Sequence, residues 1–92
     1  MEPVLIKKEE IVNLHFQSLD VLENQNEKID REQKLRSAML LGNNEHQKCK
    51  IVFRSKEGDT AIETTIWAVT DKYICLKGGL ALLIASIIEV IL

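Results

Sequence analysis

The sequence predicts a small α+β protein in which an N-terminal helical segment is followed by a five-stranded antiparallel small β-barrel. Three observations lead to this fold class. Apolar residues before residue 44 recur mostly at helical spacing, those after residue 45 alternate with a period of two, and tight-turn residues divide the alternating part into five runs. We therefore expect an N-terminal helical segment over residues 1–44 and a small β-barrel over residues 45–92.

The composition is that of one globular domain with a modest core. The chain has 92 residues, of which 46% are hydrophobic and 4% are aromatic. A chain of this length buries a smaller share of its surface than a larger domain does, so its margin of stability is small. The scarcity of aromatic residues draws attention to Trp67, the single tryptophan.

The run Ile6–Leu22 fits two interpretations. A helix would place four residues on one stripe: Ile11, Leu14, Ser18 and Leu22. A strand would instead place Val12, Leu14 and Phe16 on one face, alternating with polar residues. We favour the helix. The polar stretch Glu23–Lys28 that follows is either a loop or the exposed middle of a longer helix.

The second helix has clearer boundaries. Asp30 can cap its N-terminus, and Gln33 stands at the capping-box spacing. The apolar positions that follow form one stripe: Leu35, Ala38, Met39 and Leu41. Residues 42–44, Gly-Asn-Asn, end the helix, because Gly and Asn tolerate the left-handed conformation of a helix stop.

Five strands and their turns account for the rest of the chain. The first strand contains Cys49, Ile51 and Phe53 and ends at the turn over residues 55–59. The later elements are, in order, a strand over 61–69, a turn at 70–72, a strand over 73–76, a turn at Gly78 and Gly79, a strand over 80–84, one helical turn at 85–87 and a strand over 88–92. The phase of the alternation predicts eight core residues: Ile51, Phe53, Ile62, Ile66, Ile74, Leu76, Ile84 and Val90.

This order of elements resembles the SH3-like and Sm-like small barrels. The ending over residues 82–90 looks like the end of such barrels, where an isoleucine precedes a short closing strand. The helix ahead of the barrel also resembles the Rho-binding antiterminator family, and the whole chain, with its segment over residues 63–70, is similar to small uncharacterised bacterial proteins. The resemblance implies a binding fold. The loop over residues 77–79, Lys-Gly-Gly, offers only part of the residue pattern with which Sm-like proteins bind RNA.

Charge gives nucleic-acid binding no support. The formal net charge is −2. Residues 1–42 carry six Lys/Arg and eight Asp/Glu, and residues 43–92 carry six of each. Neither part has the basic excess that favours contacts with phosphates.

The sequence indicates neither a membrane segment nor export. The apolar run over residues 80–92 spans thirteen residues, where a membrane helix needs about 20. Residues 1–8 lack the long apolar core of a secretory signal. Cys49 and Cys75 are ordinary for a reduced compartment. We therefore expect a cytoplasmic protein.

The residues offer no constellation for catalysis or for binding a metal or cofactor. The soft metal ligands are His15, His46, Cys49 and Cys75. Cys49 lies two residues before the inward Ile51 and should share its face, whereas Cys75 is adjacent to the inward Ile74 and should point to the opposite face. We therefore expect no disulfide between the two cysteines and no structural metal. Neither histidine pairs with a nucleophile in the pattern. We therefore expect no enzyme activity and no cofactor.

Two features are candidates for binding a partner. Lys48, Lys50 and Arg54 form an outward basic row on the first strand. The row either binds anions or is a charged guard, that is, a set of charges that prevents the strand from aggregating edge to edge with another chain. Trp67 shares a phase with Val52 and Val69, so it belongs to an apolar patch that is covered either by the second helix or by a partner. We favour the charged guard and coverage by the helix.

The sequence thus predicts a non-enzymatic binding or regulatory module of a bacterial cytoplasm that acts through protein–protein contacts. The alternative is an RNA-binding or other nucleic-acid-binding adaptor of Sm-like type that uses Lys48, Lys50 and Arg54. We also expect a homodimer built largely through residues 9–41, because one short helix can hide only one of its apolar stripes. The apolar set behind this expectation is Ile11, Leu14, Phe16, Leu19 and Leu22.

Overall fold

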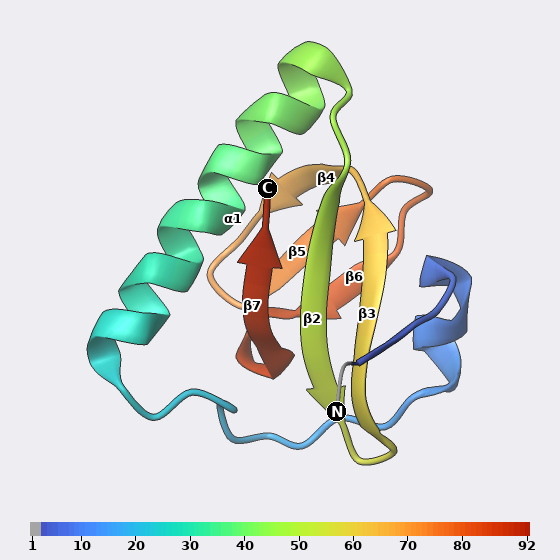
Figure 1. Ribbon diagram of the computed structural model, residues 1–92, viewed down its shortest axis with the longest axis vertical. Coiled ribbons are helices and arrows are strands. Elements are labelled where there is room, and N and C mark those ends of the chain that lie inside the picture. The colour runs from blue at the N-terminus through green and yellow to red at the C-terminus, as the bar shows by residue number, and fades with distance from the viewer. Residues whose placement is uncertain (1–2) are drawn as a thin grey trace.

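The computed structural model describes residues 3–92 and consists of one long helix packed beside two small sheets (Figure 1). The elements are, in order, β1 (Val4–Leu5), the 3-10 helix η1 (Lys8–Asn13), α1 (Gln25–Glu45), β2 (Cys49–Ser55), β3 (Gly58–Thr64), β4 (Ile66–Val69), β5 (Tyr73–Leu76), β6 (Ala81–Leu83), the 3-10 helix η2 (Ile84–Ser86) and β7 (Ile87–Ile91). Among residues 3–92, no helix combines the length and apolar character that crossing a membrane would require.

The strands form a four-stranded sheet in the order β1-β3-β2-β7 and a three-stranded sheet in the order β4-β5-β6. β1 pairs with β3 in parallel, and the other neighbours pair antiparallel. Thr65 alone separates β3 from β4, so the chain passes from one sheet to the other at that residue. Figure 1 shows the three-stranded sheet behind the four-stranded one, with α1 running diagonally along one side of both.

The predicted fold class, an N-terminal helical segment ahead of one five-stranded closed barrel, is wrong. The long helix lies in the middle of the chain, and the strands belong to two sheets. The strand expected over residues 61–69 is interrupted at Thr65, and its pairing with β5 shifts register between Ile66 and Ala68. Alternation of apolar residues reports which face of a strand is buried, but it does not report which strands hydrogen-bond to one another.

The helix predicted over Ile6–Leu22 is also wrong, apart from the short turn of η1. Residues 14–24, the extended segment, contain no helix or strand, bend at Ser18, Leu19 and Val21, and cross the lower part of the view in Figure 1. Phe16 stacks at a tilt on the buried Phe53, with ring centroids 6.0 Å apart, and the backbone N–H of Lys56 donates to the carbonyl of His15. The strand interpretation is not confirmed either, because no strand forms over residues 6–22 and Val12, one of its three residues on one face, is exposed within η1, although Leu14 and Phe16 are partly buried. Packing on Phe53 therefore selects the extended form of a segment whose own pattern is ambiguous.

The N-cap of α1 lies six residues before the predicted cap at Asp30. Asn24 is the true cap, because its Oδ1 accepts from the backbone N–H of Asn26 at 2.8 Å and of Glu27 at 3.3 Å. The helix ends at His46, which adopts the left-handed conformation with φ 55°. The polar stretch Glu23–Lys28 is thus mostly the first turn of the helix.

The apolar residues of both sheets and of α1 form one core. Seven of the eight predicted core residues are buried, and Ile84 is only partly buried. The predicted strand Tyr73–Leu76 is confirmed with the same bounds. The buried stripe of α1 consists of Arg31, Leu35, Ala38 and Gly42.

Gly42 fixes how closely α1 approaches the junction between β3 and β4. A Cβ atom at this position would lie 2.7 Å from the carbonyl oxygen of Ile66 and 2.7 Å from Cγ2 of Thr65. Such distances require the backbone of the junction or of the helix to move. A glycine inside a helix costs up to about 1 kcal/mol relative to alanine, so this position gives up helix propensity for close packing.

We predict that Gly42→Ala destabilises the fold by about 1–3 kcal/mol, because overpacking outweighs the gain in helix propensity. The exposed Ser37 in the same helix is the matched control, and Ser37→Ala should be neutral or slightly stabilising. Urea unfolding followed by circular dichroism measures both variants. A Gly42→Ala variant as stable as the wild type would show that the approach of α1 is not constrained at this residue.

Candidate functional site

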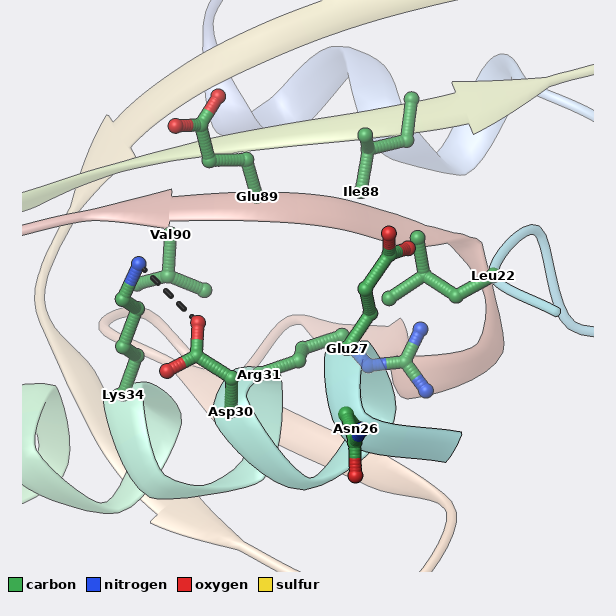
Figure 2. Close-up of a pocket in the computed structure, with 9 residues that line it drawn as sticks. All are labelled: Leu22, Asn26, Glu27, Asp30, Arg31, Lys34, Ile88, Glu89 and Val90. Carbon is green, nitrogen blue, oxygen red and sulfur yellow. Dashed lines mark ion pairs between the residues drawn. The ribbon is translucent and has the colours of Figure 1, made fainter. Parts of the chain in front are cut away.

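A groove lies between the N-terminal half of α1 and β7 (Figure 2). Its volume is about 420 Å³, within the range of about 300–1,000 Å³ that is typical of ligand-binding clefts. The lining residues come from the segment before α1, from α1 and from β7: Leu22, Asn26, Glu27, Asp30, Arg31, Lys34, Ile88, Glu89 and Val90. The groove is therefore built by parts of the chain that are far apart in sequence.

One wall of this groove is the backbone edge of β7. Three consecutive residues of the strand, Ile88, Glu89 and Val90, line the groove. β7 has a bulge at Ile88, because Glu89 pairs with Val52 whereas Ile87 pairs with Phe53. Figure 2 shows the side chains of Ile88 and Glu89 pointing away from α1 while Val90 points toward it, so the first two residues line the groove with their backbone.

Among the described residues 3–92, β7 is the end strand of its sheet, and no strand neighbours its outer edge. Within residues 3–92, the hydrogen bond that reaches β7 from the side of α1 runs from Nη1 of Arg31 to the carbonyl of Ile87, at 2.9 Å. It lies at the first residue of the strand. α1 packs beside the edge over residues 88–91, and no other hydrogen bond from the helix reaches that edge within residues 3–92.

Arg31 holds the closed end of the groove. Its guanidinium donates from Nη1 to Oδ1 of Asp20 at 2.8 Å and from Nη2 to Oδ2 of Asp20 at 2.6 Å, in addition to the bond to Ile87. Arg31 is only 7% exposed. A bidentate pair of this kind is a strong and directional interaction in a buried setting, so it fixes the extended segment, α1 and β7 relative to one another.

The groove carries an excess of negative charge. Asp30 forms an ion pair with Lys34 at 3.3 Å, and Asp20 neutralises Arg31. Glu27 and Glu89 have no cationic partner within residues 3–92. The side chain of Glu27 extends from α1 toward β7 in Figure 2, so its carboxylate faces whatever lies against the strand.

The predicted basic row is largely neutralised within the chain. Arg54 pairs with Asp59 across the hairpin, with Nε 2.7 Å from Oδ1, and this hydrogen bond raises the pKa of the guanidinium while lowering that of Asp59. Lys50 stands opposite Glu63 in the register of β2 and β3. Lys48 is exposed just before β2. The three cations therefore do not make a continuous unpaired basic surface.

Trp67 is less covered than the sequence predicts. α1 packs beside β4, yet 47% of Trp67 remains exposed. Val52 and Val69, which share its phase, are buried and partly buried, respectively. The tryptophan borders a separate hollow near the end of α1, with Asn43, His46 and other residues.

The cysteines and histidines are dispersed. No group of three or more potential metal ligands occurs in the part of the chain that the structure describes. Cys49 is buried, its Sγ lies 3.6 Å from the carbonyl oxygen of Thr64, and burial raises the pKa of its thiol to about 11. Cys75 is partly buried and, like Cys49, is a free thiol.

Sequence reasoning missed Arg31 and Asp20. A signal for Arg31 exists, because it stands four residues before Leu35 and seven before Ala38, on the stripe that the helix buries. A charged residue on such a stripe predicts a buried partner. The identity of that partner depends on the path of the extended segment, which local patterns do not give.

No protein-family model, curated protein or solved structure matches this chain. The resemblance to small barrels and to the Rho-binding antiterminator family stays a prediction.

We predict that Asp20→Asn destabilises the protein at pH 7 by about 1.5–3 kcal/mol, because it leaves a buried guanidinium without its anion. Burial alone would raise the pKa of Asp20, but the hydrogen bond from Arg31 and further favourable contacts outweigh it, and the net pKa lies below the usual 3.8. A lowered pKa stabilises the folded state above the unfolded value. That stabilisation is lost as the pH falls through the folded value.

The difference between wild type and Asp20→Asn should therefore shrink below about pH 4. Urea unfolding between pH 3 and pH 7 measures it. Asp30→Asn is the control, because its exposed ion pair with Lys34 should contribute under about 0.5 kcal/mol. Equal effects of the two substitutions, or a difference that is constant with pH, would contradict the role of the Asp20–Arg31 pair.

Proposed function

We propose that this chain is a non-enzymatic binding module that acts through protein–protein contacts, taking an extended segment of a partner into the groove as an added strand beside β7. The observation that carries the proposal is the backbone edge of β7 over Ile88–Val90, which lines the groove and lacks a strand neighbour. An exposed strand edge presents unpaired N–H and C=O groups that a second extended chain can satisfy.

The groove supplies specificity as well as backbone bonds. Leu22 and Val90 give it an apolar wall, which suits one face of an extended segment. Glu27 on the opposite wall suits a lysine or arginine of the partner. The preferred partner segment thus alternates apolar and basic residues.

Nucleic-acid binding is supported less well. It would need cations along a path for the phosphate backbone. Arg54 is engaged by Asp59, Lys50 faces Glu63 across the hairpin, and the groove itself is acidic.

A peptide titration tests the proposal. The probes are a ten-residue peptide that alternates valine with lysine and threonine, and the same peptide with glutamate in place of lysine. We expect the lysine peptide to shift the amide resonances of β7 and to slow hydrogen exchange at the outer edge of that strand, as pairing with a new strand requires. The glutamate peptide should bind at least tenfold more weakly.

Two matched charge-reversal variants distinguish binding in the groove from binding elsewhere on α1. Glu27→Lys should weaken the lysine peptide at least tenfold, whereas Glu32→Lys, on a different face of α1, should change its affinity by less than about twofold. Binding that leaves exchange in β7 unchanged, or that responds equally to both variants, would contradict strand addition in this groove.

The homodimer expected through residues 9–41 stays a prediction, with less apolar surface to support it. Ile11 is buried within this chain, and three more of the set are partly buried: Leu14, Phe16 and Leu22. Leu19 is exposed, as are Ile29 and Leu40 on the outer face of α1. Sedimentation over a range of concentrations should show a dimer that Leu40→Glu weakens. A monomer at every concentration would exclude the dimer.

A further inference from the structure

A second hollow lies at the other end of α1 from the groove. It has a volume of about 410 Å³ and is lined by Gly42, Asn43, His46, Thr65, Trp67 and Lys77. Three separate parts of the chain meet there: the end of α1, the junction between β3 and β4, and the turn after β5. The hollow shares no lining residue with the groove beside β7.

Thr65 at the base of the hollow is a buried polar residue whose hydroxyl has no hydrogen-bond partner within residues 3–92. The residue is only 4% exposed. Its methyl group lies against Gly42, and its backbone carbonyl accepts from the N–H of Lys77 at 3.0 Å. Nε of Arg31 and Oγ1 of Thr60 are the enclosed side-chain polar atoms without a partner within residues 3–92, so the hydroxyl of Thr65 is accessible from the hollow and can bond to a polar atom of a ligand there.

His46 at the rim is held in a conformation that suits glycine better. Its φ of 55° is positive, and it is the one residue other than glycine with positive φ in the described part of the chain. His46 is the C-cap of α1, where its backbone N–H donates to the carbonyls of Gly42 and Leu41. The end of the helix therefore fixes the position of His46 at the rim of the hollow.

The charges of the lining favour an anion. Lys77 is exposed and has no ion pair within residues 3–92, and no carboxylate is among the lining residues. The carbonyl end of α1 disfavours negative charge beside the helix, so an anionic group belongs on the side of Lys77 and Thr65. Trp67, almost half exposed, offers ring surface on which a planar group can stack.

We propose that this hollow binds a small molecule that joins a planar heterocycle to an anionic group, of the chemical class of a nucleoside monophosphate. The heterocycle stacks on Trp67. The anionic group lies against Lys77, within reach of the hydroxyl of Thr65, and His46 closes the rim. This site is independent of strand addition at β7.

Trp67 is the single tryptophan of the chain, so its fluorescence reports on this hollow directly. The probes are adenosine 5′-monophosphate, adenosine and ribose 5-phosphate. We expect the monophosphate to quench the fluorescence in a saturable manner. Adenosine and ribose 5-phosphate, which each lack one half of the ligand, should bind at least tenfold more weakly.

Two variants test the residues. Lys77→Gln should weaken the monophosphate at least tenfold, whereas Lys72→Gln, an exposed lysine outside the hollow, should leave its affinity unchanged. His46→Gly should also weaken binding while leaving thermal stability equal or higher, because it relieves the left-handed strain. If His46 only stabilised the fold, its replacement would not weaken binding of the monophosphate while thermal stability is retained.

A monophosphate that binds no more tightly than adenosine or ribose 5-phosphate would overturn the proposal. Equal affinities of Lys77→Gln and Lys72→Gln would also overturn it. Quenching by all three probes in proportion to their concentration, without saturation, would show collision with an exposed indole and would equally overturn it.

Discussion

The burial of one arginine is the constraint on which the architecture of this chain depends. Arg31 lies on the stripe of α1 that faces the sheets, where a guanidinium is costly unless its donors are satisfied. Asp20 and the carbonyl of Ile87 satisfy both terminal nitrogens, while Nε is buried without a partner. The three residues belong to the extended segment, the helix and the edge strand. Their pairing therefore sets where the helix lies against β7.

Gly42 fixes the helix at its other end by a different means. There the constraint is steric, because no side chain fits between α1 and the junction at Thr65. Leu35 and Ala38 fill the stretch between the two fixed points with buried apolar surface. The groove beside β7 lies near the first of these fixed points, and the hollow beside Trp67 lies near the second.

The parts of the fold that local patterns determine were predictable from the sequence. The strand Tyr73–Leu76, the turn at Gly78 and Gly79 and most of the core follow from alternation and turn chemistry. The conformation of the segment Ile6–Leu22 was not predictable, because its apolar residues fit both the helical and the strand period. Packing of Phe16 on Phe53, which is distant in sequence, contributes to the observed conformation. The division into two sheets was not predictable either, since pairing between strands is not encoded in the phase of any one strand.

The candidate sites show the same limit. The neutralisation of Arg54 by Asp59 could be predicted, because a hairpin turn places the two opposite each other. The exposure of Trp67 and the free edge of β7 could not, because both depend on where α1 lies. The stripe that contains Arg31 predicts that a partner exists, yet only the path of residues 14–24 identifies it as Asp20.

Residue-resolved hydrogen exchange of an Arg31→Met variant tests whether Arg31 holds α1 against β7, with Arg36→Met as the control on the exposed face of α1. Arg31→Met should lose protection in residues 25–34 and 87–91, while the amides of β2 and β5 keep theirs. Arg36→Met should change little. Protection in α1 and β7 that survives the loss of Arg31 would contradict the claim that this residue holds the helix against the edge strand.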